Sequence, residues 1–259
     1  MPVRSPNHER VFAVKGVGRA RRGRPVPPVL TLASLRPVAF RGWPAEAIEF
    51  FEGLEADNSK AYWQEHRATY DAAVRAPMEA LLAELAANFG PGRVFRPQRD
   101  IRFSADKSPY KTAIGAMVGE VGYVQVSARG LGLGSGMWAM AADQLERYRQ
   151  AVADEVTGPE LVAVVADVRR RRLDVTGRET LKVAPRGYPR DHPRVELLRH
   201  KGLIAWREWP PGAWLGRRSA RERVVRFLDD TRPLTDWLTA RVGPSTLAPG
   251  RPSSTTRAT

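Results

Sequence analysis

The spacing of apolar residues changes twice along the chain. In the first part they recur every three or four positions, which predicts a helix at 44–56 and a long helical region at 63–89. The polar break at 57–59 offers a helix cap. Pro77 interrupts the long region, because proline lacks the amide hydrogen that an inner helical turn needs. We therefore expect a kink there, or two abutting helices.

The middle of the chain has a period of two, as in strands whose side chains alternate between two faces. Glycine-bearing turns separate most of the alternating segments, and such short connections favour an antiparallel meander over parallel strands joined by helices. Strands are predicted at 94–103, 116–118, 122–128 and 131–138.

The helical period then returns. Helices are predicted at 142–153, 159–172, 192–201, 217–228 and 234–242, an extended or turned segment at 182–188, and a strand at 203–209. Strands grouped in the middle with helices on both sides are typical of an α+β domain. The prediction is a single α+β domain with a central, mostly antiparallel sheet of four to six strands and helices packed on it.

Both ends of the chain lack apolar periodicity. Residues 1–37 are basic and rich in proline, and 244–259 are rich in proline, serine and threonine. We expect a disordered leader and a disordered tail around a domain at 38–243, unless the leader reflects a start codon placed too far upstream. Of the net charge of +14, the leader carries +7 and the tail +2, which leaves the domain at a mild +5. Arginine groups at 169–172 and 217–226 are interpreted as solvated helix ends or faces.

Composition narrows the class of protein. The chain has no cysteine, which excludes disulfides, thiolate metal sites and cysteine nucleophiles. No apolar stretch approaches the roughly 18 residues of a membrane span, so a cytoplasmic protein with no membrane partner is expected. The histidines at 66, 192 and 200 are too scattered for a metal triad. No sequence feature names a cofactor, and the oligomeric state stays open.

The densest group of polar side chains follows the strand predicted at 94–103. Loops at strand ends often carry sites, because the rigid sheet fixes their geometry. Arginine can hold a phosphate or carboxylate through its planar fork and lysine as a point charge, while hydroxyl groups add donors. The candidate ligand-binding residues are Arg99, Arg102, Ser104, Tyr110 and Lys111, joined by Lys182 and Arg186 from a later turn.

The same segment holds the catalytic candidates Asp100, Asp106 and Lys107. The aspartates can take a proton, orient the cations or hold a metal. Ser104 and Lys107 match the Ser-x-x-Lys pattern of acyl-serine enzymes, but the accompanying Ser-Asp-Asn and Lys-Thr-Gly patterns are missing. The alternative is a solvated turn with local ion pairs, so whether the protein is an enzyme stays open.

Glycine occupies every second position from Gly130 to Gly136. No Gly-Lys-Ser/Thr follows and no helix opens there, which argues against a phosphate-binding or dinucleotide-binding turn. The favoured interpretation is a strand whose bare face lets a helix or another backbone approach closely. The alternative is a ligand that lies on the bare face.

Several local patterns occur in a distinctive order. They are Phe40-Arg-Gly-Trp-Pro44, Phe50 to Asn58 with Tyr62, Trp63 and Tyr70, Arg99 to Thr112, Gly134-Ser-Gly-Met-Trp138 with Leu145 and Arg149, and Leu181 to Tyr188 with His192, Pro193, Leu197 and Leu198. Together, over about 40–242, the chain resembles the bacterial and fungal family named domain of unknown function 2461. The resemblance implies that the leader lies outside the domain. The family pattern is most specific at 99–112, so the resemblance points to that segment as functional. It implies no activity, because none is assigned to the family.

The chain departs from the family pattern in two places. Asp57 stands where the pattern has a second asparagine, and 127–129 lacks the acidic-proline turn that precedes the glycine-rich strand. Three functions stay open. The first is binding of, or action on, a small phosphate- or carboxylate-bearing ligand through the loop at 99–112. The alternatives are nucleic-acid binding, from the charge and aromatic content, and a non-catalytic structural or interaction module.

Overall fold

The computed structural model describes residues 39–102 and 106–247. In this part six strands form one sheet in the order β1-β2-β3-β4-β6-β5, and all neighbouring strands are antiparallel. The first four follow chain order, which confirms the predicted meander. The strands are β1 (Gly92–Val94), β2 (Ala113–Val118), β3 (Gly122–Ser127), β4 (Gly130–Met137), β5 (Asp174–Thr176) and β6 (Leu203–Trp209).

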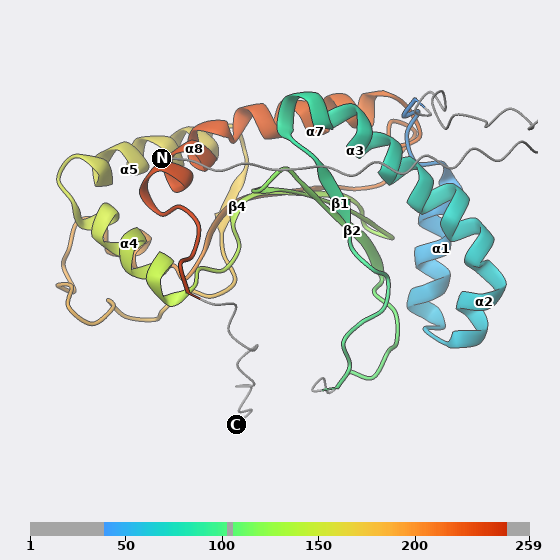
Figure 1. Cartoon of the computed structure of the whole chain (residues 1–259), viewed down its shortest axis with the longest axis horizontal. Helices are drawn as coiled ribbons and strands as arrows, with labels where there is room; N and C mark the ends of the chain where they lie inside the picture. Colours follow the sequence, from blue (N-terminus) through green and yellow to red (C-terminus); the bar gives the residue numbers. More distant parts are fainter. Residues whose placement is uncertain (1–38, 103–105, 248–259) are drawn as a thin grey trace, which may run out of the picture. The chain divides into compact units, whose positions relative to one another are not determined.

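Helices precede and follow the strands, as the periodicity predicts. Figure 1 shows α3, α7 and α8 along one face of the sheet, and no helix of the described residues across the other. The single α+β domain is therefore confirmed, with one covered and one open sheet face. The helices are α1 (Ala45–Ala56), α2 (Lys60–Thr69), the π-helix η1 (Tyr70–Arg75), α3 (Ala76–Phe89), α4 (Ala142–Ala153), α5 (Thr157–Arg170), α6 (Val195–Leu198), α7 (Ser219–Asp230) and α8 (Arg232–Arg241).

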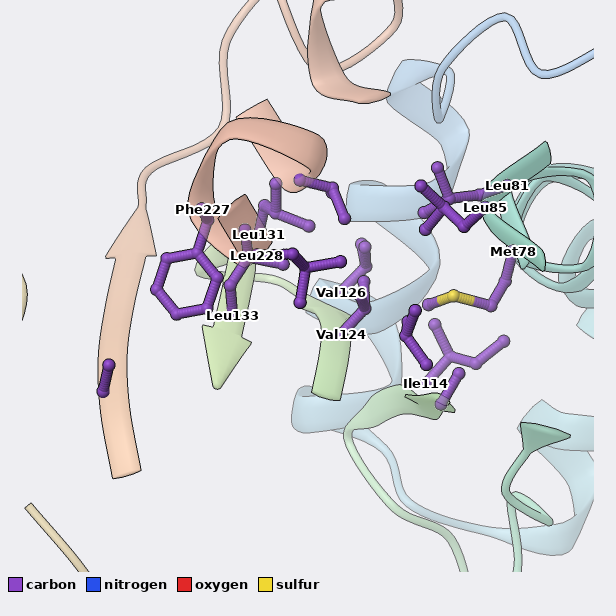
Figure 2. Close-up of a cluster of buried hydrophobic side chains, with 14 of the residues drawn as sticks. Met78, Leu81, Leu85, Ile114, Val124, Val126, Leu131, Leu133, Phe227 and Leu228 are labelled. Atoms are coloured by element: carbon purple, nitrogen blue, oxygen red, sulfur yellow. The ribbon is translucent and has the colours of Figure 1, made fainter. Parts of the chain in front are cut away.

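The core lies between the covered face and the helices. In Figure 2, Val124 and Val126 of β3 and Leu131 and Leu133 of β4 lie between side chains of α3 and α7. Each fully buried side chain of this size contributes about 1.5–3 kcal/mol relative to an exposed one. Because successive strand side chains point to opposite faces, the intervening residues of these strands belong to the open face.

The helical region around Pro77 explains how the chain accommodates this residue. The backbone stays helical, but the six residues of η1 make π-type hydrogen bonds before α3 begins. Pro77 then stands in the first turn of α3. The missing amide hydrogen thus falls where the hydrogen-bond register changes from π-type to α-type. Ser59 caps α2 by accepting a hydrogen bond from the Tyr62 amide, 3.1 Å away.

The structure corrects the prediction most clearly in two segments and adds a strand that was not predicted. The strand predicted at 94–103 ends at Val94, because Pro97 cannot donate to the ladder and the chain leaves the sheet. The helix predicted at 192–201 is confined to α6, since Arg194 has non-helical dihedral angles after Pro193. The three residues of β5 were missed, because so short an edge strand has no readable alternation.

The chain beyond α8 packs back on α4. Asp143 accepts hydrogen bonds from the Ser245 hydroxyl, at 2.7 Å, and from the Thr246 amide, at 2.8 Å. Arg147 donates to the carbonyl of Val242, 2.6 Å away. Residues 244–247, assigned to the tail from composition, therefore contact α4. The expected leader and residues 248–259 lie outside the described part.

Candidate functional site

The described residues of this segment, 99–102 and 106–112, belong to an arm between β1 and β2. Its two sides are joined by hydrogen bonds from the Arg99 amide to the Pro109 carbonyl, 2.9 Å, and from the Lys111 amide to the Pro97 carbonyl, 2.8 Å. Figure 1 shows this arm projecting from the sheet on the side opposite α3 and α7. Ser104 lies outside the described residues.

The charged side chains of the arm largely pair with one another. Arg99 forms an ion pair with Asp106, and Arg102 one with Asp100, at 2.7 Å. The Lys107 ammonium donates to the Ile101 carbonyl at 3.1 Å. All of these groups are at least one-third exposed, and such exposed pairs contribute only about 0–1 kcal/mol. The pairs are therefore easily exchanged for another partner.

The pKa values of both aspartates are lowered in this setting. The hydrogen bonds from Arg102 lower the pKa of Asp100 to about 2. Hydrogen bonds from Ser108, together with Arg99, lower the pKa of Asp106 to about 2. Proton transfer at neutral pH is most efficient for groups that titrate near 7. These carboxylates thus have the environment of ion-pair partners rather than of an acid or base.

Tyr110 lies in the core, away from solvent. It is 9% exposed, and its ring is stacked on Trp63 with the centroids 4.3 Å apart. The Asn58 side chain accepts from the Tyr110 amide at 3.0 Å and donates to its carbonyl at 3.1 Å. This two-sided contact, the Asn58 clamp, fixes the base of the arm to the turn between α1 and α2.

Lys182 and Arg186 lie far from the arm along the sheet. Both are exposed in the connection that follows β5, at one edge, whereas the arm joins β1 and β2 at the other. Five strand spacings of about 4.8 Å separate β1 from β5, or about 24 Å. The structure therefore brings Arg99 and Lys111 together but does not bring Lys182 or Arg186 to them.

The open face holds a hollow that sequence reasoning did not find. The strand register aligns Met117, Tyr123, Gly134 and Trp206 in one row across four strands. This open-face hollow has a volume of about 750 Å³. It is lined by Phe95, Met117, Val121, Tyr123, Gln125, Arg129, Gly134, Ser135, Gly136, Trp138, Thr176, Ile204, Trp206 and Glu208.

The glycines of β4 make the floor of this hollow flat. A side chain on Gly134 would place its Cβ 3.0 Å from the Trp206 ring and 3.6 Å from Tyr123. The two rings lie on either side, with centroids 6.2 Å apart and planes inclined by 28°. An aromatic side chain from the next strand therefore approaches the bare position of Gly134, whereas at Gly130 and Gly136 it is another backbone that approaches, as favoured from the sequence.

A second hollow adjoins the first at the base of the arm. This basic hollow has a volume of about 320 Å³ and is lined by Phe95, Arg99, Lys111, Thr112, Ala113, Gly115 and Tyr123. It shares Phe95 and Tyr123 with the open-face hollow. The Lys111 ammonium lies 5.6 Å from the centroid of the Phe95 ring, and burial together with nearby Arg96 lowers the pKa of Lys111.

One end of the open-face hollow is polar and carries both a positive and a negative charge. Glu208 accepts from Arg129 at 3.2 Å and from Gln125 at 3.5 Å. In the described part of the chain, no three histidine, aspartate or glutamate side chains are grouped so that they could hold a metal ion. These two hollows can contact a ligand through arginine, lysine, glutamate and amide groups and through the hydroxyls of Thr112, Tyr123, Ser135 and Thr176.

The fold and these hollows define a class: an α+β protein with one sheet face covered by helices and the other open and lined by aromatic rings. A family model described as conserved hypothetical protein (DUF2461) matches residues 46–237. The chain belongs to this family, as its sequence patterns predicted. No curated protein and no solved structure matches it. Within the described residues, no helix is long and apolar enough to cross a membrane.

Proposed function

We propose that this protein binds a small ligand that combines a flat apolar part with an anionic group. The flat part lies on Tyr123 and Trp206 in the open-face hollow. The anionic group, a phosphate or carboxylate, lies in the basic hollow against Arg99 and Lys111. The observation that carries the proposal is that the two hollows share Phe95 and Tyr123 as lining residues. The proposal concerns binding and assigns no reaction.

The dimensions support a ligand of this class. Small-molecule sites generally have volumes of about 300–1,000 Å³, mostly apolar walls and a few well-placed polar groups. The open-face hollow, at about 750 Å³, falls in this range, with aromatic rings at its centre and Gln125, Arg129 and Glu208 at one end. Flat rings favour offset stacking on aromatic side chains, at about 0.5–1.5 kcal/mol beyond the area buried.

The charges of the arm support the anionic end. Arg99 is the arginine of the arm that lines the basic hollow, and its partner Asp106 has a half-exposed side chain, at 51%. Exchanging that exposed carboxylate for one on a ligand costs little, because the ion pair is only weakly stabilising. Lys111 is held at the wall by its hydrogen bond to the Arg96 carbonyl, 2.9 Å away.

The test compares matched compounds by thermal shift and calorimetry. The probes are 1-naphthyl phosphate and indole-3-acetate, the same rings without the anion (1-naphthol and indole), and the anions alone (phosphate and acetate). The compounds that join ring and anion should bind more tightly than either part. Gly134→Val and Trp206→Leu should weaken all ring-bearing compounds.

Arg99→Gln should weaken only the compounds that carry an anion, by about tenfold or more, the usual effect of losing a charged hydrogen bond. Arg102→Gln is the matched control, since Arg102 lies in the same arm but lines neither hollow. The affinity of the Arg102→Gln variant for the anion-bearing compounds should stay within about twofold of the wild-type affinity. The proposal is wrong if ring-bearing anions bind no better than their parts, or if the two arginine variants behave alike.

Single-stranded nucleic acid is the second candidate ligand. Its support is the same row of rings, because bases stack on aromatic side chains of open sheets beside basic grooves. Arg93, whose guanidinium lies 5.1 Å from the Phe95 ring centroid, extends the basic surface. An oligonucleotide ligand predicts affinity that rises with length and falls with salt, with a slope of roughly −0.7 per phosphate neutralised. A small ligand predicts no dependence on length.

A further inference from the structure

A third hollow lies on the other face of the sheet, between β6, α7 and the end of α5. Trp206 and Glu208 of β6 line the open-face hollow, so Arg207 and Trp209 between and after them face the helices. They meet α7 and the end of α5 around a space of about 400 Å³, the arginine hollow. It is lined by Arg171, Leu173, Arg207, Trp209, Ser219, Glu222, Arg223, Arg226, Phe227 and Asp230.

The cations of this hollow outnumber its anions. Four arginines face two carboxylates, and one carboxylate, Asp230, is already held by Arg171 at 2.8 Å. Among the described residues no carboxylate lies within 4 Å of the guanidinium groups of Arg207, Arg223 or Arg226. The hollow therefore has an excess of two positive charges, which its own side chains do not neutralise.

Aromatic rings hold two of these guanidinium groups in place. The Arg207 carbon Cζ lies 4.8 Å from the centroid of the Trp209 ring, and that of Arg223 lies 4.5 Å from the Trp214 ring. A ring attracts the cation through its π face but accepts no bonds from the N–H groups at the guanidinium edge. The N–H donors thus stay available for a ligand, on side chains whose position is already restricted.

We propose that the arginine hollow binds a multiply charged oxyanion, of the phosphate or pyrophosphate class. Guanidinium groups bind such oxygens through paired N–H donors, and an excess charge of two suits a dianion better than a single carboxylate. The site is separate from the open-face hollow, because alternate residues of β6 point to opposite faces of the sheet and line the two hollows separately. From the sequence, the arginine group at 217–226 was interpreted as a solvated helix face. In this proposal two of its members, Arg223 and Arg226, bind the oxyanion.

The test is calorimetric titration of the full chain with sodium pyrophosphate and with inorganic phosphate, at constant ionic strength. Pyrophosphate should bind saturably and more tightly than phosphate. Arg207→Gln and Arg223→Gln should each weaken binding by about tenfold or more, as expected for losing a charged hydrogen bond. Arg207→Lys, which keeps the charge but loses the planar fork, should give an intermediate loss.

Arg241→Gln is the matched control, because it removes the same charge from α8 at an exposed position outside the hollow. The basic ends of the chain are the same in all variants, so comparison with Arg241→Gln removes the contribution of anions that these ends bind weakly. No saturable binding of pyrophosphate to the wild type overturns the proposal, as does an equal loss of affinity in the Arg207, Arg223 and Arg241 variants. Arg207→Gln should leave the affinity for indole-3-acetate unchanged, because Arg207 lines neither the open-face hollow nor the basic hollow, and this separates the site from the proposed function.

Discussion

The Asn58 clamp makes a direct prediction about what positions the arm. Asn58→Ala removes both hydrogen bonds to the Tyr110 backbone, at 3.0 and 3.1 Å, which connect positions 52 residues apart in sequence. The Tyr110 ring is buried against Trp63, so water can reach the freed amide and carbonyl only in part. The arm should then lose its attachment to the turn before α2.

The expected cost follows from these contacts. Each hydrogen bond has a net worth of about 0.5–1.5 kcal/mol, and leaving a buried group unsatisfied adds to it, so the loss should be about 2–3 kcal/mol. That is a large share of the roughly 5–15 kcal/mol by which a domain is stable. With a denaturant slope of about 2 kcal/mol per molar urea, the unfolding midpoint should fall by about 1–1.5 M.

Urea unfolding followed by tryptophan fluorescence measures this shift, since Trp63 is stacked on Tyr110. Asp57→Asn is the control, an exposed position one residue earlier whose replacement should change stability by no more than about 0.5 kcal/mol. Asn58→Ala should also weaken binding of the ring-bearing anions, because Arg99 and Lys111 depend on the position of the arm. If the two variants unfold at the same urea concentration, the clamp does not hold the arm.

Two further predictions concern the ends of the sheet and of the chain. Hydrogen bonds, chiefly from the Thr246 amide, hold the pKa of Asp143 below its usual range. The ionised Asp143 side chain therefore stabilises the fold fully above its unfolded-state pKa of about 4. This stabilisation is lost as the pH falls through the lower pKa of the folded state. In thermal melts, Asp143→Asn should therefore differ most from wild type near about pH 6 and least near about pH 2, and a difference independent of pH would contradict this origin. Gly136 has a φ of +127°, and a Cβ there would meet the Leu203 carbonyl oxygen. Gly136→Ala should thus destabilise by at least about 2 kcal/mol in urea unfolding, and an unchanged midpoint would show that β4 adapts without strain.

The elements were predictable where the signal is local. Helices α1, α4, α7 and α8 have apolar residues at helical spacing, and β2, β3 and β4 have alternation bounded by glycine turns, so existence and type followed from the pattern. The boundaries failed where backbone hydrogen bonding decided the outcome. Pro97 ended a strand that side-chain alternation alone would extend, and η1 changed the helical register at a proline that predicts only an interruption.

The open-face hollow could not be predicted from the sequence, because the rows of side chains that line it form only when the strands are paired in register. Tyr123 and Trp206 are separated by 83 positions, and Gly134 brings them together only after β3, β4 and β6 are paired. The alternating glycines were the one local signal, and they indicated a bare strand face on which a helix or another backbone was favoured over a ligand. The arm was conspicuous instead because its charges are contiguous, yet contiguous opposite charges tend to pair with one another, as Arg102 and Asp100 do.

The family resemblance acquires a physical meaning from this arrangement. Its patterns at 50–58 and 99–112 meet in the Asn58 clamp, so these two distant patterns describe one joint between the first helices and the arm. Asn58 and Tyr110, the two residues of that joint, hold the arm and do not line the basic hollow. What the joint fixes is the position of Arg99 and Lys111 beside Tyr123. The chemistry to be tested therefore lies beside the joint, on the open face of the sheet.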